Sequence, residues 1–208
     1  MNEAQQTRLL RILPLAFIGL TLAIVILYFA TLDRPIGEKY RTLDELGGPF
    51  TLRNKHGDFS LSDIEGKVGV LYFGFLNCTE ACPASIAVVL AAYGKLTPEE
   101  RERVQFVFIS VDPERDSLED LIEFGEYYDN DIIAVTGTEQ EIDDLTRQYG
   151  VYFDLVDLEG SAFEYTVDHS SRFYMVDKAG KLLTTMSHST TPTELAARIQ
   201  QMLVAKDS

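Results

Sequence analysis

The hydrophobic positions of this chain fall into segments of different period, and each period indicates a different element. Residues 68–75 and 104–111 are almost wholly apolar, which is typical of central strands buried on both faces of a sheet. A third, shorter apolar run covers 132–135. These three segments predict the strands of a buried sheet.

Two further segments alternate between apolar and polar residues on either side of a turn. The first covers 50–61, with Asn54 and Gly57 bounding its turn, and the second covers 172–186, with Gly180 in its turn. Alternation interrupted by a Gly-containing turn predicts a β-hairpin in both places.

Four helices are expected from apolar residues at helical spacing and from their start signals. The first has Pro83 in its first turn and ends at Gly94, and the others begin at the caps Ser117, Thr138 and Thr191. Thr138 and Thr191 are each followed three residues later by Glu, which is the capping-box pattern.

This order of elements predicts an α/β layered domain. A parallel central pair of strands closed by an antiparallel hairpin is the thioredoxin arrangement, here with an additional hairpin at its N-terminal side. We expect this domain to cover residues 47–208.

Before the domain lies an uncharged apolar segment at residues 12–32. At about 1.5 Å per residue its length matches the roughly 30 Å of a bilayer core, and the residues at its end form a poor signal-peptide cleavage site. We therefore expect a single transmembrane anchor in contact with membrane lipid. A short tail (1–11) precedes this anchor and a polar linker (33–46) follows it. The basic residues on its two sides do not decide its orientation.

The charge of the chain narrows the range of partners. With 18 Lys and Arg against 33 Asp and Glu, the net charge is −15, which excludes nucleic acid as a partner because that affinity depends on cationic side chains. An acidic surface serves solubility, or it steers the protein toward a basic partner or a cation. The sequence leaves both interpretations open.

Only two cysteines are present, Cys78 and Cys82, directly before Pro83. They follow a predicted buried strand and open a predicted helix, where we expect i and i+4 to share one face and the helix N-terminus to favour thiolates. Ligands of α/β folds bind outside the carboxyl ends of strands. A metal site or a redox disulfide is therefore expected, with a structural disulfide or two small core residues as the alternative.

Among the three histidines, His169 is the candidate third ligand. It precedes the predicted second hairpin, beside the cysteine turn of a thioredoxin topology, whereas His56 lies in a hairpin turn and His188 in a loop. Thioredoxin-type oxidoreductases have a cis-proline at that place, but no proline occurs between Pro113 and Pro192. This absence favours metal binding over disulfide exchange.

Acidic residues near these positions have simpler explanations. Asp112 begins an Asp-Pro turn, and Asp112 or Asp116 is suited to pairing with Arg115 or capping the helix that follows. For Glu80 a solvated position on the helix surface is favoured over a contact with the metal.

With these motifs in place, the chain resembles the Sco/SenC family of copper metallochaperones, which act in cytochrome c oxidase assembly. The resemblance extends over roughly residues 47–187. The matching segments are, in order along the chain, Gly47-Gly-Pro-Phe50, Tyr72-Phe-Gly-Phe75, Cys78-Thr-Glu-Ala-Cys-Pro83, Ser110-Val-Asp-Pro-Glu-Arg-Asp116 and Val167-Asp-His-Ser170. It implies that Cys78, Cys82 and His169 are copper ligands. Leu76-Asn77 and Thr79-Glu80 depart from the usual family residues.

Copper suits these donors because thiolates select soft Cu(I) and imidazole suits Cu(II). By the resemblance, the partners are the cytochrome c oxidase subunit that carries the copper site and a copper donor or thiol-reductant protein. We expect a non-enzymatic chaperone on the extracytoplasmic side of a bacterial inner membrane. The alternatives are a thiol:disulfide oxidoreductase and a redox or copper sensor.

Overall fold

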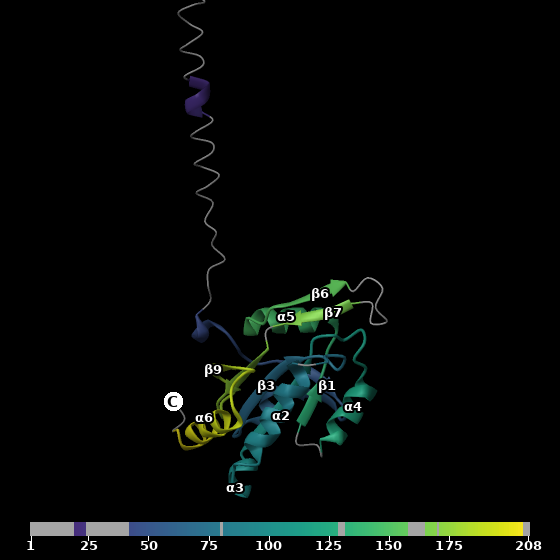
Figure 1. The fold of residues 1–208 in the computed structure, drawn as a ribbon, viewed down its shortest axis with the longest axis vertical. Coiled ribbons are helices and arrows are strands. Elements are labelled where there is room, and N and C mark those ends of the chain that lie inside the picture. Colours follow the sequence, from purple (N-terminus) through teal and green to yellow (C-terminus); the bar gives the residue numbers. More distant parts are fainter. Residues whose placement is uncertain are drawn as a thin grey trace, which may run out of the picture. The chain divides into compact units, whose positions relative to one another are not determined.

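A five-stranded mixed sheet organises the second of the two units into which the chain divides, Arg41–Ser208 (Figure 1). The computed structural model describes residues 19–23, 42–79, 81–128, 132–157, 165–169 and 171–205. The sheet has the strand order β5-β4-β3-β8-β9. Its strands are β3 (Val68–Gly74), β4 (Val104–Ser110), β5 (Ile132–Val135), β8 (Arg172–Val176) and β9 (Leu182–Ser187).

Two smaller strand pairs accompany the central sheet. They are β1 (Thr51–Asn54) with β2 (Gly57–Ser60), and β6 (Phe153–Asp157) with β7 (Tyr165–His169). The described helices are η1 (Leu43–Glu45), η2 (Leu61–Ile64), α2 (Ala81–Tyr93), α3 (Pro98–Arg101), α4 (Leu118–Tyr127), α5 (Glu139–Tyr149) and α6 (Pro192–Val204).

Strand β3 is the centre of the core because every one of its residues is buried. Val70 and Tyr72 face the apolar side chains of α2 and α6. Leu71 and Phe73 face the opposite way, into a cluster that includes α5 and the β1–β2 hairpin. A strand covered on both faces requires a continuous apolar sequence, and this part of the fold is therefore confirmed.

The register of β3 with β4 places the carboxyl ends of these two strands next to each other. They run parallel, from Val68 beside Val104 to Gly74 beside Ser110. Strand β8 pairs with β3 in the antiparallel direction and β9 continues from β8. The segments that follow Gly74 and Ser110 consequently meet at one edge of the sheet, as in the expected thioredoxin-like arrangement.

The helix starts show one correction to the sequence prediction. Helix α2 begins at Ala81, so Cys78 lies before the helix and not on it. The sharing of one helix face by i and i+4 is thus not what brings the two cysteines together. The other caps are confirmed: Ser117, Thr138 and Thr191 each accept a hydrogen bond from the backbone three residues on.

Five elements were not expected from the sequence: η1, η2, α3, β6 and β7. Strand β7 ends at His169, which pairs with Phe153. His169 was expected in a loop, and its backbone instead lies at the end of a strand.

The first unit, Met1–Tyr40, is described only at residues 19–23, which are helical. The expected anchor at 12–32 otherwise lies outside the described residues. Among the helices that the structure describes, none is long and apolar enough to cross a membrane.

Candidate metal centre

The cysteine pair lies at the carboxyl end of β3, where the strand ends at a glycine. A Cβ atom placed on Gly74 would lie 2.8 Å from the Sγ of Cys82 and 2.9 Å from ring atoms of Phe108 and Tyr72. Real Cβ atoms do not approach other heavy atoms so closely. Gly74 therefore allows the sulfur of Cys82 to pack directly against the backbone of the strand.

Cys82 is the deeper of the two thiols. It lies in the first turn of α2 and is 3 % exposed. The hydroxyl of Tyr72, itself fully buried, donates to its Sγ at 3.8 Å. Interaction with the Cys78 sulfur and burial raise the pKa of the Cys82 thiol far above its usual range, so metal bound here must displace its proton.

Cys78 is the accessible thiol. It is partly exposed, and its sulfur accepts a hydrogen bond from the backbone N–H of Cys82 at 3.3 Å. An amide at a helix N-terminus favours negative charge on such a sulfur. The two cysteines are not joined by a disulfide, so the arrangement can bind a soft metal or close to a disulfide.

The segment after β7 reaches the same region at Ser171. This residue follows His169 by two positions, and its side chain lies near the hydroxyl of Tyr72. Burial raises the pKa of Tyr72, and Ser171 opposes that rise. The hydroxyl of Tyr72 thus lies close to both Cys82 and Ser171.

The side chain of His169 lies outside what the structure describes, and its role as a metal ligand stays a prediction. Within the described side chains, no group of three or more His, Cys, Asp and Glu residues is placed to hold a metal. Of the three predicted ligands, the structure brings together Cys78 and Cys82.

The other two histidines lie where the sequence predicted. His56 is exposed in the β1–β2 turn, where its backbone N–H donates to Asn54. His188 is exposed just after β9, and its backbone N–H donates to the carbonyl of Ser171 at 3.1 Å.

The acidic candidates after β4 have structural contacts, as the sequence analysis favoured. Asp112 accepts from the Nε of Arg115 at 2.6 Å. Asp116 does not cap α4, because Ser117 does so. Its carboxylate instead accepts from the backbone N–H of Leu76, and burial raises its pKa to about 6. Glu80 lies outside the described residues.

Sequence reasoning missed Tyr72, Gly74 and Ser110 as neighbours of the site. Tyr72 and Gly74 lie within an apolar run whose period indicates only a buried strand. A Gly inside a strand signals a close approach of another group, and this was the one available clue. Only the packing of α2 against β3 determines that the group approaching Gly74 is the Cys82 sulfur.

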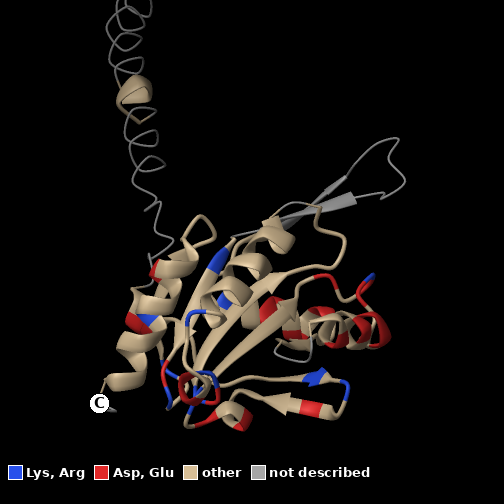
Figure 2. Cartoon of the chain, turned by 60° about the horizontal axis from the view of Figure 1, so that its bottom comes forward, with Lys and Arg blue, Asp and Glu red and all other residues tan. Residues whose placement is uncertain are grey.

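The negative charge is partly concentrated on one helix. Helix α4 exposes Glu119, Asp120, Glu123 and Glu126, and acidic positions follow one another along it in Figure 2.

Comparison with known proteins places this arrangement in a family. The SCO1/SenC family model matches residues 38–204. The protein sco1 of Schizosaccharomyces pombe is 32% identical over 172 residues, which cover 82% of this chain and 62% of the relative. The chain thus spans less than two thirds of that relative's length.

Solved structures share the fold. Yeast Sco1 with copper bound is 30% identical with a TM-score of 0.69, and the match covers 78% of this chain and 91% of that chain. BsSco, described as having a disulfide switch and as a member of the Sco family of cytochrome c oxidase assembly proteins, is 26% identical with a TM-score of 0.61. That match covers 82% of this chain and all of BsSco.

The unbridged cysteine pair at the end of β3, the thioredoxin-like sheet and a family match over 38–204 lead to one assignment. This chain belongs to the SCO1/SenC family.

Proposed function

We propose that this chain binds copper through Cys78, Cys82 and His169 and delivers it to the copper site of cytochrome c oxidase. The observation that carries the proposal is the unbridged thiol pair at the carboxyl end of β3, one thiol buried and the other partly exposed. The copper-bound yeast relative and the oxidase-assembly description of BsSco support it.

The two thiols have different roles in binding a metal ion that is later transferred. Cys82 lies on α2, and its sulfur is packed against β3 and accepts a hydrogen bond from Tyr72, so it provides a fixed donor. Cys78 is reachable from solvent and provides the donor that exchanges metal with a partner. Cu(I) is satisfied by two thiolates, and His169 adds the nitrogen donor that Cu(II) prefers.

Location follows from the same chemistry. Cysteine pairs that close to a disulfide belong to an oxidising compartment. We propose that residues 12–32 anchor the chain in a bacterial inner membrane, with the domain on the extracytoplasmic side. Tethering would raise the local concentration of the domain near a membrane-embedded oxidase subunit.

Copper titration of the protein tests the ligand set. Against a competing chelator, replacement of both cysteines by Ser should abolish binding of both oxidation states. His169→Ala should weaken Cu(II) by at least about tenfold, because even a residue that only supports a metal ligand typically contributes that much. Its Cu(I) affinity should change little.

His56→Ala is the matched control, because it removes a solvent-exposed histidine in the β1–β2 turn. It should leave both affinities unchanged. Copper binding that survives loss of both cysteines would refute the metal site. A His169→Ala variant that binds Cu(II) like the wild type would remove His169 from it.

A second function, thiol:disulfide exchange with a partner, is favoured by one specific observation. The partly exposed sulfur of Cys78 accepts the N–H of Cys82, an arrangement that favours a reactive thiolate. The disulfide switch described for BsSco supports a reversible disulfide in this chain as well.

A further inference from the structure

The short turn that carries Cys78 has little structure of its own. After β3 ends at Gly74, three residues lead to Cys78, whose backbone N–H donates to the carbonyl of Phe75 at 3.3 Å. Cys78 itself precedes the helix. The position of Cys78 therefore depends on the contacts that residues 75–77 make with other parts of the chain.

The carboxylate of Asp116, forty residues after Leu76, hydrogen-bonds to the backbone of this turn. It is 1 % exposed, and one oxygen, Oδ2, accepts both the backbone N–H of Leu76 at 2.9 Å and the hydroxyl of Ser110 at 2.6 Å. Among the residues that the structure describes, none is a hydrogen-bond partner of its other oxygen, Oδ1. Burying a carboxylate with an unpaired oxygen costs free energy, which suggests a role other than stability.

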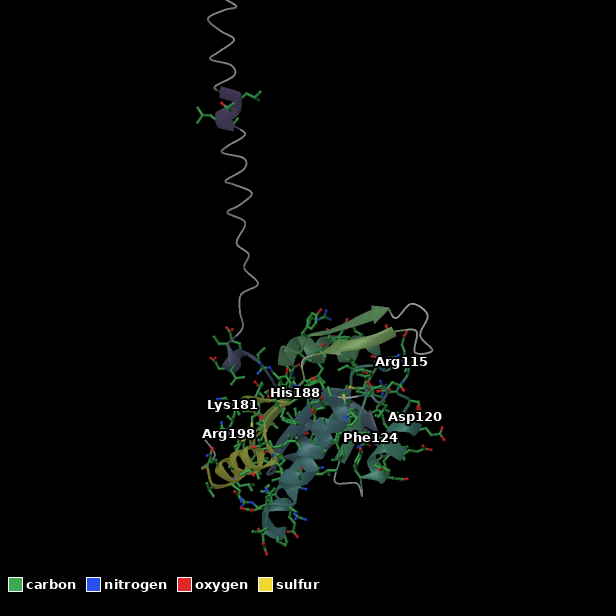
Figure 3. All side chains as sticks on the ribbon, in the orientation of Figure 1. Arg115, Asp120, Phe124, Lys181, His188 and Arg198 are labelled. Carbon is green, nitrogen blue, oxygen red and sulfur yellow. The ribbon has the colours of Figure 1, made fainter. Side chains whose placement is uncertain are left out.

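The groups around Asp116 are themselves held in place. The hydroxyl of Ser110 accepts the backbone N–H of Asp112 at 3.1 Å, which orients it toward Asp116. Arg115, labelled in Figure 3, pairs with Asp112 and lies 6.0 Å from the ring centre of Phe75. Asp116 thus hydrogen-bonds to the backbone of the turn at Leu76, and Arg115 lies over the ring of Phe75, the first residue of the turn.

We propose that Asp116 is a positioning residue that holds the Cys78 turn in the dithiol geometry and opposes closure of the Cys78–Cys82 disulfide. This rests on the proposed function of the cysteine pair and assigns a control of its redox state. The Leu76 amide that Asp116 holds lies only two residues before Cys78. A contact that is stronger in one state shifts the equilibrium toward that state.

The direction of the shift follows from the geometry of disulfides. The S–S bond of a disulfide is about 2.05 Å long, much shorter than the contact between two unbonded sulfurs, and the structure holds Cys78 and Cys82 in the unbridged state. Because the Cys82 sulfur is packed against Gly74 in the buried core, we infer that closure moves Cys78 and its turn and strains the Leu76–Asp116 hydrogen bond. Weakening that bond should therefore favour the disulfide.

The test is a redox titration of the metal-free full chain against glutathione. The two thiols lose two protons and two electrons as they form one S–S bond, and glutathione disulfide takes these up to give two glutathione thiols. Asp116→Ala should shift the dithiol–disulfide equilibrium by about tenfold toward the disulfide, as expected for a lost hydrogen bond to a charged group.

Two further variants separate positioning from charge and from stability. Asp116→Asn keeps a carbonyl oxygen that can accept both hydrogen bonds, so its equilibrium should stay within about threefold of the wild type. Asp120→Asn is the matched control, because that carboxylate serves the α4 cap through Ser117 and not the turn. It should leave the equilibrium unchanged even if it lowers stability.

Three results would overturn the proposal: no shift in Asp116→Ala, an equal shift in Asp120→Asn, or an equal shift in Asp116→Asn. If Asp116→Ala does not fold, Ser110→Ala takes its place and should shift the equilibrium in the same direction by a smaller factor. The absence of any shift in Ser110→Ala would then refute the proposal. Copper is absent from these measurements, so a result that overturns the role of Asp116 leaves the metal-binding proposal standing. Conversely, a chain that gives the expected redox shifts but does not bind copper would refute only the metal-binding proposal.

Discussion

At the scale of single residues, the packing around Cys82 depends on the absence of a side chain at position 74. The space that a Cβ would occupy is already filled by the Cys82 sulfur and by the rings of Phe108 and Tyr72. None of these groups can withdraw easily, because both rings are fully buried in the core. The glycine therefore serves the site and not the conformation of the strand.

Gly74→Ala should consequently damage both stability and metal binding. Overpacking of this kind costs about 1–3 kcal/mol in free energy of unfolding, and displacement of the Cys82 sulfur should lower copper affinity by at least about tenfold. Urea unfolding and chelator competition measure the two effects.

Gly125→Ala is the control, because among the described residues a Cβ there meets only the carbonyl of Ile132 at 3.4 Å. It should change stability by no more than about 1 kcal/mol and leave copper affinity unchanged. A Gly74→Ala protein with native stability and affinity would contradict the packing described here.

At the scale of elements, the start of α2 separates the two thiols into different environments. Cys78 lies in the turn before the helix and is partly exposed, while Cys82 lies inside the first turn at 3 % exposure. The elevated pKa of Cys82 keeps it protonated in the absence of metal. The asymmetry comes from where the helix begins and not from the cysteine spacing.

Alkylation of the reduced protein should reveal this asymmetry. Iodoacetamide reacts with thiolates that solvent reaches, so Cys78 should be modified at least about tenfold faster than Cys82 in the native chain. Peptide mass spectrometry during the reaction measures both rates, and the same reaction in urea should show similar rates. Equal rates in the native state would be inconsistent with the described position of α2.

At the scale of the whole molecule, the chain divides into Met1–Tyr40 and Arg41–Ser208. The sheet, its covering helices and the cysteine pair all belong to the second unit. The proposed membrane attachment belongs to the first, through residues 12–32. Folding and membrane attachment should therefore be separable.

Flotation with lipid vesicles tests this separation. The full chain should rise with the vesicles, whereas a chain beginning at residue 41 should not, and both should unfold at the same urea concentration. Leu22→Asp is the control within the full chain, because a carboxylate near the centre of a span costs about 2.5–3.5 kcal/mol and should reduce flotation. A fragment that floats like the full chain would show that residues 12–32 are not the attachment.

Much of the fold was determined by the sequence alone, because it follows from local patterns. Continuous apolar runs indicated β3 and β4. The cap Ser117 indicated the start of α4, and the pairing of Thr with Glu three positions on indicated the starts of α5 and α6. Strands β6 and β7 were missed because their segment, 153–169, mixes polar and apolar residues without a clear period.

For the site, the sequence identified the two cysteines because only two are present and both follow a buried strand. Only the tertiary structure decided that Cys78 lies outside the helix, that Tyr72 contacts Cys82, and that Asp116 holds the amide of Leu76. These contacts join residues up to forty positions apart. They depend on the register of β3 with β4 and on the packing of α2 against β3, and no local pattern encodes either.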